Sequence, residues 1–164
     1  MGEPLFKAEG ASKAERYEAF LRLYAPFIKG ETDPVTAMAN TAAALREAFG
    51  FFWVGFYVVK GEHLQLAPFQ GPVACSQIRY GRGVCGTAWQ QRKTLVVPDV
   101  EQFPGHIACS SLSRSEIVVP VMDDGRVLAV LDIDSKHLNA FDTTDQSYLE
   151  QVCQMLTNIM KSEE

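Results

Sequence analysis

Residues 116–134, EIVVPVMDDGRVLAVLDID, contain two apolar runs around the turn sequence Asp123-Asp124-Gly125, the pattern of a β-hairpin. Side chains alternate between the two faces of a strand, so the length of the turn decides which residues share a face. A two-residue turn pairs Glu116 with Ile133 and mixes carboxylates with aliphatic side chains on both faces. A three-residue turn over 123–125 leaves one face wholly apolar. The sequence therefore favours the three-residue turn.

This register predicts specific partners across the hairpin. It pairs residues Glu116 with Asp132, Val118 with Val130, and Pro120 with Leu128. The apolar face then comprises Ile117, Val119, Val121, Val127, Ala129, Leu131 and Ile133. Glu116, Asp132 and Asp134 share the opposite face, where close carboxyl groups raise each other's pKa unless a cation binds. A solvated strand end is the alternative role for these three residues.

Residues 51–59 predict another strand, because aromatic and β-branched residues dominate them. One face is apolar and is expected to lie under helices: Phe52, Val54, Phe56 and Val58. The other face carries Trp53 and Tyr57 with Gly55 between them, which predicts a gap with two aromatic walls. Ordinary core packing is the alternative role for the two aromatic residues.

The remaining pattern predicts an α+β domain. Helices are expected over 12–28, 34–49, 83–91 and 143–161, and shorter strands over 64–69 and 94–97. Strands joined as hairpins and flanked by helices indicate an antiparallel sheet with helices on one face. The segments 71–93 and 98–113 are long loops or irregular stretches, and long ordered loops in a compact domain are typically functional.

Length and charge exclude several classes of protein. The 164 residues fit a single domain over 1–164, with 1–11 expected as a loose N-terminal tail. The net charge of −5 argues against nucleic acid and anionic membranes as partners. No apolar run approaches the ~18 residues of a membrane span. No secretory signal is evident, so a cytoplasmic protein is expected.

The cysteines and glycines allow several kinds of site. Residues 81–86, GRGVCG, match the dinucleotide fingerprint, but the polar residues 75–80 before them do not form a buried parallel strand. We therefore expect a tight turn that leads into a short helix. A metal set of Cys75, Cys85, His106 and Cys109 lacks the spacing of ordinary zinc modules, and no metal is expected. Cys153 is expected to be a buried small hydrophobe in the last helix.

Cys109 has the surroundings of a reactive thiol. It lies in a long loop beside serines, seven residues before Glu116. A reactive thiol has to be partly exposed and able to ionise. Neighbouring carboxylates oppose its ionisation, and a substrate with a positive charge would relieve that conflict.

Several motifs together resemble the free methionine-(R)-sulfoxide reductases, a family built on the GAF domain. The resemblance covers about residues 34–160. The motifs are WVGFY at 53–57, PFQG at 68–71, GRGVCG at 81–86, VPDV at 97–100, FPGHIAC at 103–109, SRSEIVVP at 113–120 and LDIDS at 131–135. The family often has an acidic residue after the nucleophile, where this chain has Ser110.

The resemblance implies a GAF-like fold with the pocket under long loops, opposite the helices. It implies that Cys109 is the nucleophile, that Cys75 is the main resolving thiol, and that Cys85 is able to assist. The residues it implies for the substrate pocket are Trp53, Tyr57, Glu116, Asp132 and Asp134.

The implied activity is reduction of free L-methionine-(R)-sulfoxide through a sulfenic acid and an intramolecular disulfide. Thioredoxin is the implied reductant, and no bound cofactor is expected. A homodimer is expected because GAF domains often pair through helices. The alternatives are a non-catalytic GAF domain that binds a small ligand or senses oxidants, and a structural metal-binding domain.

Overall fold

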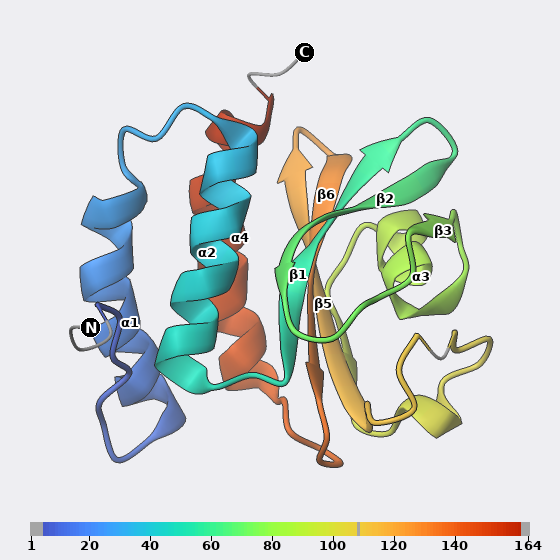
Figure 1. Ribbon diagram of the computed structural model, residues 1–164, viewed down its shortest axis with the longest axis horizontal. Coiled ribbons are helices and arrows are strands. Elements are labelled where there is room, and N and C mark those ends of the chain that lie inside the picture. The colour runs from blue at the N-terminus through green and yellow to red at the C-terminus, as the bar shows by residue number, and fades with distance from the viewer. Residues whose placement is uncertain (1–4, 108, 162–164) are drawn as a thin grey trace.

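An antiparallel sheet of six strands forms the centre of the computed structural model, which describes residues 5–107 and 109–161 (Figure 1). The strand order is β3-β2-β1-β6-β5-β4. The strands are β1 (Trp53–Lys60), β2 (His63–Gln70), β3 (Gln77–Arg79), β4 (Leu95–Val97), β5 (Ser115–Asp123) and β6 (Arg126–Ser135). The sequence pattern does not predict β3. This strand is short and lies at the edge of the sheet, and only its residue Ile78 is buried, so it leaves no clear apolar pattern.

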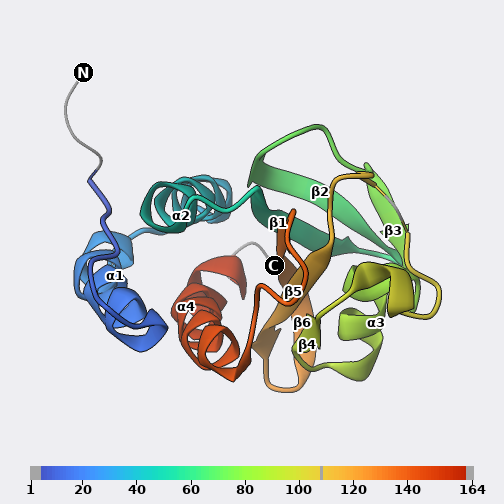
Figure 2. The same ribbon diagram turned by 90° about the horizontal axis from the view of Figure 1, so that it is seen from below.

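Three of the helices lie on one face of this sheet and one lies on the other (Figure 2). Helices α2 (Pro34–Phe49) and α4 (Thr143–Lys161) pack directly on the strands, and α1 (Lys13–Ile28) packs on α4 and α2. The short helix α3 (Gly83–Gln91) covers β5 and β6 from the opposite side, near a 3₁₀ turn at Val100–Gln102. The predicted α+β architecture is confirmed, with α3 as an additional helix on the face opposite α2 and α4 (Figure 2).

The helix ends follow local capping chemistry. Ser12 and Asp33 accept hydrogen bonds from backbone N–H groups in the first turns of α1 and α2, and Asp142 does the same for α4. Gly50 ends α2 in the left-handed conformation, with φ 67°. These residues fix where α1, α2 and α4 begin and where α2 ends.

The β5–β6 hairpin differs from its prediction at the turn. Asp124 and Gly125 form a two-residue turn, with φ values of 49° and 80°. A β-bulge follows at Leu128, so that Val121 pairs with Ala129. The predicted three-residue turn is therefore wrong. The bulge nevertheless restores the predicted alternation of faces for the rest of the hairpin.

The bulge also changes the partners across the hairpin. Glu116 lies opposite Asp134, not opposite Asp132, and the other two predicted pairs are displaced by the same two residues. A displacement by two residues preserves the side-chain period, so the three carboxyl groups still share one face. Val127 precedes the bulge and packs on the opposite face from the one predicted.

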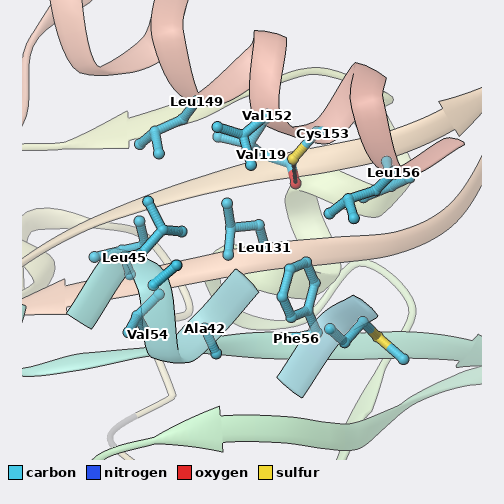
Figure 3. Packing of buried hydrophobic residues seen from close by; sticks show 14 of the residues in the cluster. Ala42, Leu45, Val54, Phe56, Val119, Leu131, Leu149, Val152, Cys153 and Leu156 are labelled. Carbon is cyan, nitrogen blue, oxygen red and sulfur yellow. Dashed lines mark hydrogen bonds between the residues drawn. The ribbon is translucent and has the colours of Figure 1, made fainter. Parts of the chain in front are cut away.

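The main core lies between the sheet and helices α2 and α4 (Figure 3). Val54 and Phe56 contribute to it from β1, as predicted. Phe52 does not, because it precedes β1 and packs with the residues of the other face. Cys153 is buried in this core, and its Sγ lies 3.8 Å from the carbonyl oxygen of Val119. Its predicted role as a buried hydrophobe is confirmed.

The expected N-terminal tail is attached to the helices at Phe6. This side chain is buried, and its ring contacts Phe20 and Phe27 at centroid distances of 5.9 and 5.1 Å. Its backbone N–H donates a hydrogen bond to the Glu47 carboxylate. Residues 1–4 of the expected tail lie outside the described residues. Among the described residues, no helix has the length and apolar character needed to cross a membrane.

Candidate active site

A pocket lies on the face of the sheet opposite α2 and α4. It is bounded by β1, β5, β6, the start of α3 and the two long loops. Its lining comprises Phe52, Trp53, Tyr57, Val73, Ala74, Ile78, Gly83, Val84, Cys85, His106, Ile107, Cys109, Ser110, Ser113, Glu116, Asp132 and Asp134. Seven of the eight predicted site residues therefore line one pocket, and the eighth, Cys75, is bonded to Cys109.

A disulfide joins Cys75 to Cys109, with their Cα atoms 5.5 Å apart. The bond links the loop after β2 to the loop before β5, two segments that are separated in sequence but adjacent at the pocket. The Tyr57 hydroxyl donates a hydrogen bond to the Cys75 carbonyl oxygen at 2.9 Å. This contact ties the Cys75 loop to the middle of the sheet. The disulfide leaves Cys75 and Cys109 unavailable for the considered metal set with Cys85 and His106.

The aromatic residues of β1 close over Gly55. The rings of Trp53 and Tyr57 stack with centroids 6.1 Å apart, and the ring of Phe69 stacks on Trp53 at 5.2 Å. The Trp53 Nε1–H donates to the carbonyl oxygen of Pro72 at 3.0 Å, which holds the indole in place. The predicted gap between two separated walls is therefore wrong: the two rings form one continuous apolar wall of the pocket.

Gly55→Ala is expected to destabilise the protein by about 1–3 kcal/mol, the usual cost of overpacking. A Cβ at this position would collide with Phe69 Cβ and come within 2.9 Å of Trp53 Cη2. Urea denaturation measures the change in free energy of unfolding. Unchanged stability would show that the strand and the aromatic wall yield easily, contrary to the packing described.

Three carboxyl groups come together on the same face. Glu116 and Asp132 are each 6% exposed, and Asp134 is half-buried at the end of β6. Among the described residues, the buried Oδ1 of Asp132 has no hydrogen-bond partner. A buried oxygen without a partner lowers the stability of the free protein, and it is suited to bind a proton or a cation.

Burial raises the pKa of all three carboxyl groups. For Glu116, the charges of Asp132 and Asp134 add to burial, and the pKa lies well above its ordinary value. The pKa of Asp134 rises for the same two reasons, burial and the charge of Asp132. For Asp132, burial outweighs the lowering effect of hydrogen bonds with Glu116 and Cys85. The cluster therefore retains protons at pH values where exposed carboxyl groups have lost theirs.

Cys85 contributes a thiol from the first turn of α3. Its sulfur and one carboxylate oxygen each from Glu116 and Asp132 lie within 4.8 Å of one another. Burial, followed by the charges of these carboxylates, raises the pKa of the Cys85 thiol. The thiol therefore stays protonated while the carboxylates beside it are charged.

The glycines around Cys85 form a tight turn, as predicted. Gly81 and Gly83 have positive φ values of 74° and 61°, and the Gly81 N–H donates to the carbonyl oxygen of Gly86. A Cβ on Gly86 would collide with the carbonyl oxygen of Arg79. The absence of this Cβ lets α3 approach β3 closely and directs Cys85 toward the sheet. The preceding strand is a short antiparallel edge strand, unlike the parallel strand of a dinucleotide fold.

Glu116→Gln is expected to stabilise the protein without substrate at neutral and higher pH. The pKa of Glu116 is higher in the folded than in the unfolded chain, so its contribution to stability is complete below the unfolded pKa of about 4.3 and is lost as the pH rises through the folded pKa. The amide of the variant does not ionise, so this loss of stability does not occur. In urea denaturation across pH, the free energy of unfolding should therefore fall less steeply with rising pH for the variant than for the wild type.

Glu62→Gln, at an exposed turn, is the matched control and should follow the wild type. A steeper decline for Glu116→Gln than for the wild type would contradict the raised pKa.

The sequence patterns missed part of the pocket. Strand period predicts the helix side for Phe52, but its ring lines the pocket, and the Nζ of Lys136 lies 5.0 Å from the ring centroid. Arg46 donates to the Phe52 carbonyl oxygen at 2.9 Å. The loop residues Val73 and Ala74 have no period that predicts their direction. The disulfide and the hydrogen bonds from Trp53 and Tyr57 place their loop against the pocket.

Comparison with known proteins places this geometry in a family. Residues 31–161 match the model of the GAF domain. The chain is 57% identical to GAF domain-containing protein A of Dictyostelium discoideum, over 96% of this chain and all of that protein. It is 39% identical to the free methionine-R-sulfoxide reductase of Escherichia coli K12, over 91% of each chain.

A solved structure of a related enzyme has the same fold as this chain. The free methionine-R-sulfoxide reductase of Neisseria meningitidis, determined by X-ray crystallography in complex with its substrate, superimposes with a TM-score of 0.93. The two chains are 51% identical, over 97% of this chain and 96% of that one. The resemblance noted in the sequence is confirmed, and the chain belongs to the free methionine-R-sulfoxide reductases, a family of GAF-domain proteins.

Proposed function

We propose that this protein reduces free L-methionine-(R)-sulfoxide to methionine, with Cys109 as the nucleophile. The observation that carries the proposal is the Cys75–Cys109 disulfide, which lies against a pocket lined by buried carboxyl groups. The substrate named for the related enzymes has a polar S=O group and a free ammonium group. A thiol pair and a carboxyl cluster match both groups.

The first step uses the Cys109 thiolate. It attacks the sulfoxide sulfur while a protonated carboxyl of the cluster donates a proton to the sulfoxide oxygen. Glu116 is the strongest candidate for this acid, because burial and two neighbouring carboxylates raise its pKa. The oxygen passes to Cys109 as a sulfenic acid, and methionine is released. The sulfoxide gains two electrons and the thiol loses two.

The second step uses Cys75. Its thiol attacks the sulfenic sulfur of Cys109, water leaves, and the disulfide described above forms. Thioredoxin then reduces this bond by thiol–disulfide exchange. Cys85 is the second candidate for resolution, but its buried thiol with a raised pKa is a weaker nucleophile than an accessible one. We therefore assign the main resolving role to Cys75.

Two walls of the pocket recognise the substrate. The carboxylates among Glu116, Asp132 and Asp134 bind the ammonium group, and the unpartnered Oδ1 of Asp132 is an available acceptor. The stacked rings of Trp53 and Tyr57 hold the S-methyl group. A methionine sulfoxide residue within a peptide has no ammonium group, so this arrangement selects the free amino acid.

The setting of the reaction follows from the same chemistry. The cycle needs thiols and an acid, so we propose that no bound cofactor takes part. Reduction by thioredoxin requires a reducing compartment, for which we propose the cytoplasm.

We also propose a homodimer, because Leu23 and Phe27 on α1 are 43% and 41% exposed and suit a contact between helices.

A direct assay separates this function from a redox sensor of the same fold. The reduced protein is mixed with free L-methionine sulfoxide that contains both the R and the S epimer at sulfur, together with thioredoxin, its reductase and NADPH. We expect methionine to appear and the R form alone to be consumed. A sensor would form the disulfide with peroxide but release no methionine.

A further inference from the structure

We propose that Cys85, Glu116 and Asp132 form a binding site for a thiophilic divalent cation of the Zn²⁺ class, and that this cation inhibits the enzyme. The inhibitory effect rests on the proposed function, because the cation would take the place of the substrate ammonium group. Binding itself is independent of that function. The cation is an inhibitor in this proposal and takes no part in the reaction.

The three side chains are close enough to share one ion. One ligand atom from each lies within 4.8 Å of the others, and all three residues are buried. Tetrahedral zinc, with bonds of about 2.3 Å to sulfur and about 2.1 Å to oxygen, holds its ligand atoms about 3.5 Å apart. Each pair of ligand atoms therefore has to approach by no more than about 1.3 Å to reach this geometry. Water or the Asp134 carboxylate supplies the fourth ligand.

Two atoms of the cluster point to a cation. The Oδ1 of Asp132 is buried without a hydrogen-bond partner among the described residues, although most buried polar atoms have one. The Cys85 sulfur lies within 4.8 Å of one carboxylate oxygen of the same residue, and the proposed catalytic cycle leaves this thiol unused while Cys75 and Cys109 react. Oxygen acceptors alone are enough to bind an ammonium group, so its binding does not require the neighbouring sulfur. A thiophilic cation is coordinated by both the carboxylate oxygens and the sulfur.

The donor set determines which cations fit. A thiolate with two carboxylate oxygens suits Zn²⁺, Co²⁺ and Cd²⁺, whereas Mg²⁺ and Ca²⁺ prefer oxygen ligands alone. The thiol gives up its proton to solvent when its sulfur bonds to the cation. Since the cation occupies oxygens of Glu116 and Asp132, the inhibition is expected to be competitive with methionine sulfoxide.

Cobalt binding to the disulfide form tests the site without turnover. In this form Cys85 and Cys153 are the free thiols, so a sulfur-to-cobalt charge-transfer band reports one of these two. We expect one equivalent of Co²⁺ to produce the band in the wild type and in Cys153→Ser. We expect Cys85→Ser to lose it. A wild type without the band, or a Cys85→Ser variant that keeps it, would overturn the proposal.

A second measurement needs no variant. The disulfide form of the wild type is alkylated slowly with and without Zn²⁺, and mass spectrometry of peptides follows Cys85 and Cys153 in the same sample. We expect Zn²⁺ to slow alkylation of Cys85 at least tenfold and to leave that of Cys153 unchanged. Equal rates for Cys85 with and without Zn²⁺ would overturn the site. Turnover by chelator-treated reduced protein is scored separately, so a failure of the proposed function remains distinguishable.

Discussion

Cys109→Ser is expected to abolish steady-state reduction of free methionine-(R)-sulfoxide, with a loss of about a thousandfold or more. An alcohol at this position ionises far less readily than a thiol, and it does not form the sulfenic acid on which the second half of the cycle depends. Methionine formation is measured by chromatography under multiple turnover, with thioredoxin as the reductant. The folded state of the variant is checked by circular dichroism.

Cys153→Ser is the matched control for this variant. It also replaces a thiol by an alcohol, but Cys153 lies in the core between α4 and the sheet, away from the pocket. We expect kcat near that of the wild type. A Cys109→Ser variant that turns over as fast as Cys153→Ser would overturn the assignment of the nucleophile.

Acetylation of the substrate amine is expected to reduce kcat/KM by about 30-fold to several thousandfold. N-acetylmethionine sulfoxide has no ammonium group, and the buried carboxylates would lose their charged partner. A buried charge pair that loses one partner costs about 2–5 kcal/mol. The two substrates are compared at the same enzyme concentration by measuring methionine or N-acetylmethionine released.

The variant Asp132→Asn provides the complementary test of amine recognition. It removes a carboxylate that binds the ammonium group, so it should weaken binding of the free amino acid. The difference in kcat/KM between the free and the acetylated substrate should then become smaller. Equal kcat/KM values for the free and the acetylated substrate with the wild-type enzyme would contradict recognition of the ammonium group.

Sequence patterns located the faces of the sheet better than its register. The turn at Asp124-Gly125 has two residues, and a bulge at Leu128 offsets the difference. A face is predictable because burial of a continuous apolar surface stabilises the fold whatever the turn. A bulge adds one residue without leaving a pattern in the sequence, so the partner of Glu116 was predicted two residues away.

The pocket also shows the limit of strand periodicity. Strand period predicts the correct side of the sheet for Trp53 and Tyr57. It does not predict their contact over Gly55, because period alone does not give the direction of a large ring. The same limit applies to the loops, because the positions of Cys75 and Cys109 depend on contacts between distant segments, namely the disulfide and the hydrogen bond from Tyr57. The family resemblance, rather than spacing, implied their roles.

The most direct test of the account is a single-turnover measurement with Cys75→Ser. Without the main resolving thiol, the reduced variant should attack the sulfoxide once and then stop. Adding excess free methionine-(R)-sulfoxide without a reductant should release about one methionine per chain, and mass spectrometry should find the added oxygen on Cys109. A variant that releases no methionine, or that carries the oxygen on Cys85 instead, would contradict the central claim that Cys109 is the nucleophile.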